Sequence, residues 1–589
     1  MFETCRYQKA VELRPDLSVL SFNLAQALEA QQNARSKQHT IRTEVEEFQT
    51  SSDNGDAIEK LHFRALELDP NATASLCAIV LNRLYALNWQ SRETLLRRIQ
   101  RTDDGHCSNT FYAAATSPSA EHLITVARAE ARKLHAQSLK LQSHRQWTRK
   151  QKRSAGSAQP LQVAVVSSDF GAHSVGSLLH RVFQHLSRDV VNVSCIATAP
   201  GDGTSMHLDF ARTNRGGCDS FRTWSSNSDG GIAYPNAALF EDLSQANIVV
   251  DLNGLSHGHV GSVLVARPST TLSYLGFPSS SSGLHDYFVT DAVVTPPDLY
   301  TSSNSAALRE QAFEFEEHLL ILARPYIVSS YTERDPRPEA KMFLQHPVRF
   351  FFDQNASGSP SEEALPHEQL RIARSNPHLR LPGDRFILCN FGQLYKVTPE
   401  VLDAWANILR QRRNALLWVL RHPSAGSTGP RNFVAEMNAR GIASRRIVIT
   451  DHVTLDDHLS LKTLGDLHLD TFPYNGHTTA LDAIWAGVPH ISLGGTSSPS
   501  RVGQSVLRGL HSTGDGYGAG KPRHSHVSST GWRKQPLDAI LGVHSLKEYE
   551  CVSSTFAKLQ SQPRRAFRQH ITNLRHAPDG LFGIRAWVR

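Results

Sequence analysis

The stretch Leu467-His-Leu-Asp470, continued by Thr-Phe-Pro-Tyr-Asn-Gly-His-Thr-Thr479, decides the fold of this chain. Its first residues are mostly apolar and end at Asp470, as in a buried strand. Pro473 and the Asn-Gly pair after it mark a turn. A helical pattern then begins at His477 and ends at Gly487, a residue type that commonly terminates helices. A strand, a turn and a helix in this order predict one unit of a parallel α/β sheet.

Similar apolar runs lie before and after this stretch and fall into two series. They are Leu161–Phe170, which runs into a polar turn, Val190–Ala197, Ile248–Leu252 and Thr271–Leu275, and then Phe386–Phe391, Ala415–Leu420, Arg446–Thr450, Asp466–Leu469 and Pro489–Leu493. They predict an α/β lobe over residues 160–330 and a second over 384–589, joined by an irregular connection at 331–383. Residues 512–537 are expected to be an insert, and the tail from Ser545 to be helical. Open α/β sheets bind ligands beyond the carboxyl ends of their strands, which favours a substrate cleft between the lobes.

Residues 1–140 have a helical pattern, and two segments within it resemble each other. The segments Tyr7–Asp16 and His62–Asn71 are both amphipathic and both close with a proline, as the second helix of a tetratricopeptide repeat does. The two prolines are farther apart than the ~34-residue period, so the polar stretch Gln32–Asp56 is interpreted as an insertion. Two unrelated amphipathic helices are the alternative.

The composition excludes several classes of protein. The 589 residues carry a net charge of +7, and no basic stripe alternates with aromatic residues, so nucleic-acid binding is not expected. No apolar run reaches the ~18 residues that span a bilayer, and the first residues lack the apolar core of a signal peptide. The seven cysteines are scattered without zinc-ligand spacing, which predicts free thiols in a reducing compartment. We therefore expect a protein of the cytoplasm or nucleus with no membrane partner.

The helix that begins after the opening stretch is the first candidate site. Free N–H groups and the dipole at a helix start suit a diphosphate, and the hydroxyls of Thr478 and Thr479 add donors. Asp482, one turn into the helix, is a candidate acceptor for a ribose hydroxyl. The structural alternative is that Thr478 only caps the helix and Asp482 only complements its dipole.

A second candidate is Lys396, in the segment Cys389–Pro399 between a strand and a helix. A fixed cation at this position can neutralise the charge that builds on a leaving nucleoside diphosphate. We expect no metal, because the chain has no Asp-x-Asp pair that would hold one. The alternative for an isolated lysine is an ordinary solvated side chain.

Two histidines complete the candidates. His173 follows the first strand and can orient or help deprotonate an acceptor hydroxyl, since imidazole titrates near neutrality. His458 follows a strand of the second lobe and can stack on a nucleotide base. The alternatives are a loop histidine that caps the next helix, for His173, and a surface helix residue, for His458.

Together these motifs resemble the O-GlcNAc transferase family. The stretch 470–479, the loop Gln393–Lys396 and the loop Ser167–His173 occur in the family's order. Shorter matches are Gly254, Arg267-Pro268, Leu275–Pro278, Asp286-Tyr287 and Thr290-Asp291. The resemblance implies tetratricopeptide repeats followed by a GT-B pair of Rossmann-like lobes. It also implies transfer of N-acetylglucosamine from UDP-GlcNAc to Ser/Thr of nuclear and cytosolic proteins.

The resemblance also assigns a role to each candidate. The donor diphosphate is expected at Lys396, His477, Thr478 and Thr479, and the ribose at Asp482; Gln393 is expected beside the donor, His458 near uracil and His173 on the acceptor side. It implies a metal-independent inverting displacement at the anomeric carbon. The general base stays unassigned, because the sequence around Glu241–Asn247 does not match the family's pattern.

The chain departs from the family at three places. Leu455 stands where the family often has a lysine near the ribose, and Leu461 replaces a basic residue after His458. Ser279–Ser282 replaces a Gly-Thr-Ser turn near the sugar. Two alternatives therefore stay open. One is the related protein O-fucosyltransferase branch, which uses GDP-fucose but usually lacks the histidine at 477 and the Gln-Leu-Tyr before Lys396. The other is a catalytically inactive scaffold that binds proteins through its helices.

Overall fold

A computed structural model describes most of the chain, and two compact units divide it. The described residues are 2–14, 16–38, 47–101, 110–117, 119–142, 159–212, 217–224, 237–256, 260–265, 268–297, 314–334, 385–422, 428–451, 455–510, 541–559, 561–575 and 581–582. The first unit comprises 1–108, 346–385 and 390–453, and the second 109–345, 386–389 and 454–589.

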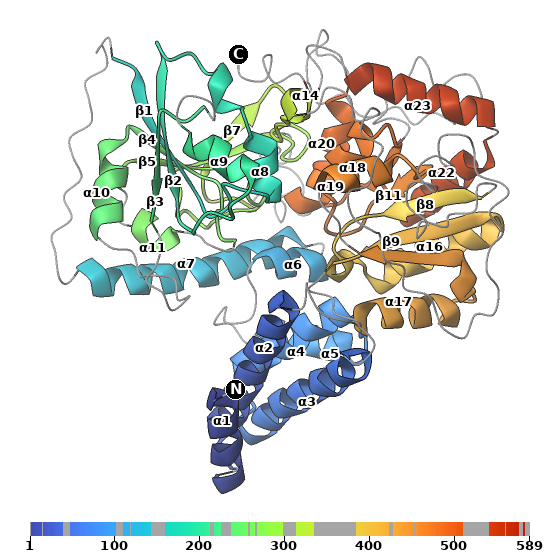
Figure 1. The fold of residues 1–589 in the computed structure, drawn as a ribbon, viewed down its shortest axis with the longest axis horizontal. Coiled ribbons are helices and arrows are strands. Elements are labelled where there is room, and N and C mark those ends of the chain that lie inside the picture. The colour runs from blue at the N-terminus through green and yellow to red at the C-terminus, as the bar shows by residue number, and fades with distance from the viewer. Residues whose placement is uncertain are drawn as a thin grey trace, which may run out of the picture. The chain divides into compact units, whose positions relative to one another are not determined.

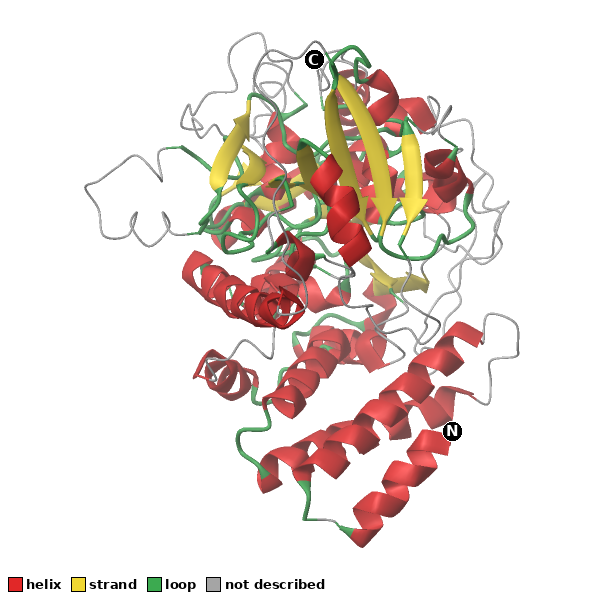
Figure 2. Cartoon of the chain, turned by 90° about the vertical axis from the view of Figure 1, so that its left-hand side faces the viewer, coloured by secondary structure: helices red, strands yellow, loops and turns green. Residues whose placement is uncertain are grey.

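The first unit begins with helices that pack one on the next along the chain. They are α1 (Phe2–Leu13), α2 (Ser18–Gln38), α3 (Glu47–Leu68), α4 (Thr73–Ala86) and α5 (Arg92–Arg101). Figure 2 shows them side by side with no strand among them. The polar stretch 32–56 is largely helical, at the end of α2 and the start of α3. The predicted helical segment is present, while its assignment to tetratricopeptide repeats stays a prediction.

The rest of the first unit holds two strands and their helices. In chain order these are η3 (Leu394–Lys396), α16 (Pro399–Gln411), β9 (Ala415–Arg421), α17 (Thr428–Ala439), η5 (Ser444–Arg446) and β10 (Ile447–Asp451). Thr398 caps α16 by accepting from the Val401 N–H at 3.4 Å, and Pro399 occupies its first turn. The ring of Tyr85 on α4 lies 5.3 Å from that of Tyr395, so the helical segment contacts the turn that carries Lys396.

A seven-stranded sheet dominates the second unit. Its order is β3-β2-β1-β4-β5-β6-β7 and every pair is parallel; the strands are β1 (Leu161–Ser167), β2 (Val191–Ala197), β3 (Ser220–Thr223), β4 (Ile248–Asp251), β5 (Thr270–Ser273), β6 (Tyr287–Asp291) and β7 (His318–Leu322). The order reverses between β1 and β4. Ligands of open parallel sheets bind beyond the strand ends at such a reversal.

Helices cover both faces of this sheet (Figure 1). One face packs against α10 (Ala237–Gln245) and α11 (Gly261–Leu264), through a core that includes Val166, Ile196 and Leu243. In Figure 1, α8 (Ser174–Leu179) and α9 (Ser205–Ala211) lie on the other side of the strands, and the short turn η2 (Phe183–His185) follows α8. Helix α6 (Thr110–Thr116) packs on α7 (Ala120–Gln142), which contacts α11.

A six-stranded sheet has the order β10-β9-β8-β11-β12-β13. Its remaining strands are β8 (Phe386–Asn390), β11 (Leu467–Leu469), β12 (His490–Leu493) and β13 (Gly542–Val543). The other helices and turns of the second unit are α14 (Tyr331–Arg334), α18 (Leu455–Lys462), α19 (Thr478–Trp485), η6 (Ser498–Ser500), α20 (Val502–Arg508), α22 (Leu546–Lys558) and α23 (Ser561–Arg575). The order reverses between β8 and β11, so the opening stretch, which follows β11, begins at a reversal point.

The α/β fold class is thus confirmed, and each predicted strand is present within three residues of its expected ends. Sequence reasoning missed β3, β6, β7 and β13. Most of the connection 331–383, and all of the insert 512–537, lie outside the described residues. The helical tail is confirmed by α22 and α23. The predicted lobe boundaries stay predictions.

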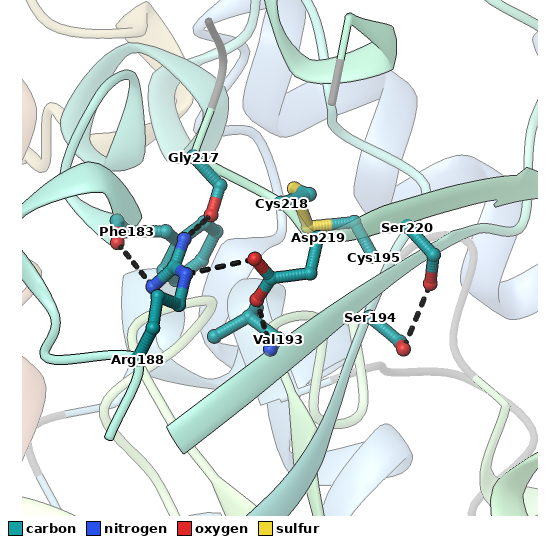
Figure 3. The surroundings of a disulfide bond; sticks show 9 residues. All are labelled: Phe183, Arg188, Val193, Ser194, Cys195, Gly217, Cys218, Asp219 and Ser220. Carbon is teal, nitrogen blue, oxygen red and sulfur yellow. Dashed lines mark hydrogen bonds and ion pairs between the residues drawn. A yellow bond between two sulfur atoms is a disulfide. The ribbon is translucent and has the colours of Figure 1, made fainter. Parts of the chain in front are cut away.

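The expectation of uniformly free thiols is wrong, because Cys195 and Cys218 form a disulfide (Figure 3). Cys195 lies on β2, and Cys218 lies two residues before β3, the strand that pairs in parallel with β2. Arg188 flanks the bond: it pairs with Asp219 at 2.8 Å and donates to the carbonyls of Phe183 and Gly217. Both cysteines are fully buried.

Within the described part of the chain, no helix is long and apolar enough to cross a membrane.

Candidate active site

The turn after β11 is built on the carboxylate of Asp470. Oδ1 accepts from the N–H groups of Thr471 at 2.9 Å and Gly476 at 2.6 Å, while Oδ2 accepts from the Ser492 hydroxyl at 2.7 Å. A side chain at Gly476 would collide with Thr479 Oγ1, which explains the glycine. Asp470 therefore holds the backbone of the turn and links it to Ser492 on β12, which restricts the conformation of the turn.

The start of α19 is the exposed part of this stretch. Between Pro473 and Leu493, only His477, Thr478 and Thr479 are partly exposed; all the other residues are buried. His477 is the N-cap residue and makes no side-chain cap, so the alternative of a purely capping role for Thr478 does not apply. Among the described residues, no group accepts from the Thr478 or Thr479 N–H. The N–H groups of Thr478 and Thr479 and the positive end of the helix dipole thus lie at the one partly exposed end of a helix that is otherwise buried.

Asp482 is placed differently from the expectation. It is only 3% exposed: one carboxylate oxygen accepts from the Tyr331 hydroxyl and the other pairs with the ammonium of Lys462. Tyr331 also stacks on Trp485, one turn farther along α19. A ribose contact at Asp482 stays a prediction, and the ribose would share a carboxylate whose two oxygens each have one partner already.

His458 lies on α18, the helix that also carries Lys462. Its side chain is 6% exposed, so the alternative of a surface residue is wrong. Leu461 on the same helix is also buried. Helix α18 packs against α19, which brings the helix predicted to reach the base against the helix predicted to hold the diphosphate.

Gln393 and Lys396 belong to the first unit, in the turn after β8. The side-chain oxygen of Gln393 is shielded from water, and no donor reaches it from any residue that the structure describes. An unsatisfied buried acceptor costs about 1–3 kcal/mol, so it indicates a position that a ligand completes. Lys396 is half-buried and ends the turn η3.

His173 lies at the reversal point of the seven-stranded sheet, in the loop between β1 and α8. Its Nδ1 accepts from the Val175 N–H at 3.4 Å, so this histidine does cap α8, as its structural alternative requires. The same Nδ1 lies 3.4 Å from Asp169 Oδ2, and the side chain is still 56% exposed. The imidazole is therefore held by one nitrogen and accessible to solvent.

Sequence reasoning missed Lys462, Tyr331 and Asp169. Nothing near Lys462 distinguishes it from a solvated lysine, and its partner comes from another helix. Tyr331 lies at the start of the segment interpreted as an irregular connection. Asp169 stood in the quoted loop, four residues before His173, and that spacing was a usable signal.

Two buried histidines lie beside the turn after β11. His468 on β11 and His490 on β12 place their Nδ1 atoms 2.8 Å apart, and His490 Nε2 is 3.3 Å from Asp470 Oδ2. Burial lowers the pKa of His468 well below its ordinary value, and the neighbouring His490 and Lys462 lower it further. The two histidines therefore connect β11 to β12 next to Asp470, the residue that follows β11.

Comparison with known proteins decides the family. The model of glycosyl transferase family 41 matches residues 121–330 and 348–514, which include every candidate residue named above. This chain belongs to glycosyl transferase family 41. The match to family 41 begins in α7 and ends just beyond α20, so it includes the seven strands β1 to β7 and the strands β8 to β12 of the other sheet.

Two curated relatives and one solved structure are similar to this family 41 chain. It is 30% identical over 365 residues to the probable UDP-N-acetylglucosamine–peptide N-acetylglucosaminyltransferase SEC of Arabidopsis thaliana, covering 62% of this chain and 32% of the relative. It is 26% identical over 427 residues to the Caenorhabditis elegans UDP-N-acetylglucosamine–peptide N-acetylglucosaminyltransferase, covering 61% and 36%. This chain therefore spans about a third of the length of these relatives.

The solved structure is a mutant of the Thermobaculum terrenum O-GlcNAc transferase. It aligns over 100% of this chain and 93% of that one, with a TM-score of 0.62 and 19% identity. At this identity the likeness concerns the fold alone, and it agrees with the GT-B architecture that the resemblance implied.

Proposed function

We propose that this chain is a protein O-GlcNAc transferase that moves N-acetylglucosamine from UDP-GlcNAc to Ser/Thr hydroxyls of proteins. The start of α19 carries the proposal. This otherwise buried helix begins with the N–H groups and hydroxyls of Thr478 and Thr479, and no acceptor for the two N–H groups lies among the residues that the structure describes. This arrangement matches the charge and the acceptor oxygens of a diphosphate. Membership of family 41 and the names of the relatives support N-acetylglucosamine as the sugar.

The proposed reaction is a single inverting displacement. The acceptor oxygen forms a bond to the anomeric carbon while the bond from that carbon to the diphosphate oxygen breaks, and the electron pair leaves with UDP. The acceptor proton passes to a base on the opposite side of the sugar. Lys396 and the α19 N–H groups stabilise the charge that develops on the diphosphate, so no metal is required.

His173 is proposed on the acceptor side. Its half-exposed imidazole lies at the reversal point of the first sheet, where a hydroxyl can approach. An imidazole in this position orients the hydroxyl and helps to remove its proton, which typically contributes about 10²–10⁴-fold to the rate. Gln393, with its unsatisfied oxygen, is proposed to contact the donor, and His458 to lie near its base.

Protein partners and compartment are proposed more broadly. The helices α1 to α5 are proposed to be tetratricopeptide-like and to contact other proteins, including substrates. The cytoplasm and nucleus are the proposed compartments. The disulfide between Cys195 and Cys218 is the observation that opposes these compartments, because a reducing compartment keeps cysteines as thiols.

The experiment offers purified protein two donors. UDP-GlcNAc or GDP-fucose is supplied with a Ser/Thr-rich peptide and EDTA, and mass spectrometry of the peptide measures transfer. Transfer of N-acetylglucosamine in EDTA is expected. Transfer only from GDP-fucose would replace the proposal with the fucosyltransferase branch. Transfer from neither donor, with no donor binding by calorimetry, would leave the inactive scaffold.

A further inference from the structure

Asp169 lies close enough to His173 to influence which ring nitrogen of the imidazole carries the hydrogen. Its Oδ2 is 3.4 Å from His173 Nδ1, and the carboxylate is mostly buried while the imidazole is largely exposed. The two residues are four positions apart, the spacing of one helical turn. They lie in the loop after β1, however, so the conformation of that loop makes the contact.

The carboxylate of Asp169 is held in one orientation by its neighbours. Ser168 Oγ donates to Oδ1 at 2.9 Å, and Asn253 Nδ2 donates to Oδ2 at 2.8 Å. Asn253, which follows β4, also accepts from the Ser168 N–H at 2.9 Å. These bonds join the loops after β1 and β4, the two strands that flank the reversal point of the sheet.

Asn253 is fixed in turn by a deeper pair. Its N–H donates to Asp251 Oδ1 at 2.9 Å, and the other oxygen of Asp251 lies 2.9 Å from His285 Nε2. All three side chains are buried. Asp169 is therefore the outer end of a connected polar chain, and His173 is the exposed group that this chain meets.

Two groups compete for His173 Nδ1, and they require different states of the ring. The Val175 N–H, at 3.4 Å, needs Nδ1 without a hydrogen. The Asp169 carboxylate, also at 3.4 Å, needs Nδ1 with a hydrogen. The two heavy-atom distances are equal, and the contact with Asp169 is an ion-pair distance, so we expect charge to decide between them: hydrogen bonds to an ionised acceptor are roughly twice as strong as neutral ones.

We propose that Asp169 is a positioning residue that holds His173 in the tautomer with hydrogen on Nδ1, which leaves Nε2 as the basic nitrogen. This rests on the proposed function, in which His173 orients the acceptor hydroxyl and helps to remove its proton. Only the tautomer with a free Nε2 accepts a proton on the exposed side of the ring. The opposite tautomer uses its basic nitrogen to cap α8 and is inert as a base.

The test begins with a readout that needs no donor or acceptor. Diethyl pyrocarbonate modifies imidazole nitrogens that carry a free, accessible lone pair, and mass spectrometry gives the rate at His173, with the exposed His318 as internal reference. In Asp169→Ala the Val175 N–H is the remaining partner of Nδ1, so Nε2 carries the hydrogen. The His173 rate should fall several-fold at pH 8 while the His318 rate is unchanged. An unchanged His173 rate would overturn the proposal.

Asp169→Asn gives a graded second variant. Because Asn253 Nδ2 must meet an oxygen, the carboxamide oxygen occupies the position of Oδ2 and can still accept from His173. The variant keeps the acceptor and loses the charge, so its rate should lie between those of wild type and Asp169→Ala. It also carries the test if Asp169→Ala does not fold.

Enzyme kinetics supply the third comparison. Asp169→Ala should lower kcat at least about tenfold with little change in the KM for donor. The matched control is Asp242→Ala, which removes a carboxylate paired with Arg222 at 2.8 Å and bonded to Trp224, without contact to His173. It should change neither kcat nor the His173 rate. If no variant and no wild-type protein transfers sugar, the proposed function fails, and the modification rates still decide the tautomer.

Discussion

Lys462 on α18 places its ammonium against the carboxylate of Asp482 on α19, and neither side chain is appreciably exposed to water. Burial lowers the pKa of Lys462, and the charge of Asp482 opposes that shift. Tyr331 donates to the second oxygen of the same carboxylate. The ion pair therefore ties the helix that carries His458 to the helix that presents Thr478 and Thr479.

The first prediction concerns this pair. Lys462→Met leaves the Asp482 carboxylate buried without its cation, so the free energy of unfolding should fall by about 3–5 kcal/mol. Urea unfolding followed by circular dichroism measures the change. The double variant Lys462→Met/Asp482→Asn should recover most of the loss, because it buries no uncompensated charge. Lys9→Met, which breaks an exposed pair with Glu12, should cost at most about 1 kcal/mol. A single-variant loss as small as that of Lys9→Met would contradict the prediction.

The second prediction is a pH dependence set by His468. Its folded-state pKa is depressed, so the unfolded chain binds a proton that the folded chain refuses once the pH falls below ~6.5. Stability from this group is complete above ~6.5 and is lost below it, by up to about 1.4 kcal/mol per pH unit. Unfolding in urea from pH 7.5 to 5 should therefore have a smaller slope against pH in His468→Gln than in wild type. The exposed His318→Gln is the control and should keep the wild-type slope. Equal slopes for wild type and His468→Gln would refute the assignment.

The sequence predicts the framework of the sheets and the position of the turn after β11, because both depend on local patterns. Apolar runs predict β1 and β11, and the proline and the Asn-Gly pair within residues 473–476 predict the turn. Lys462 was not predicted, since burial of a lysine depends on a partner that only the packing of α18 on α19 supplies. The polar strand β3 and the disulfide beside it were missed for a related reason. In the strand register Cys195 lies opposite Phe221, so the bond to Cys218 depends on the path of the chain before β3, and no spacing motif records that path.

The third prediction tests the disulfide. It closes the segment 196–217, in which Asp202 accepts from the Ala172 N–H at 2.6 Å and His207 contacts the Phe170 carbonyl at 2.7 Å. The double variant Cys195→Ala/Cys218→Ala should lose about 3 kcal/mol of unfolding free energy, because its unfolded state is no longer constrained. Hydrogen exchange should also accelerate at residues 170–172, which this segment supports. The exposed free Cys551→Ala should change neither quantity. Equal stability of oxidised wild type and the double variant would argue against the bond.

The last prediction concerns Lys396. If its cation stabilises the departing diphosphate, its loss acts on the transition state more than on bound donor. Lys396→Met should then lower kcat at least about 10²-fold, as removal of one preorganised electrostatic donor typically does. The thermal unfolding midpoint should stay near that of wild type, because the side chain is half-buried and the turn η3 is held by Leu394 and Tyr395.

Lys396→Arg is the matched variant, since it keeps the charge but changes its reach, and it should retain more activity than Lys396→Met. The peptide assay in EDTA measures all three proteins. Near-normal turnover in Lys396→Met would remove this lysine from the mechanism and leave the N–H groups of α19 as the stabilising groups for the diphosphate.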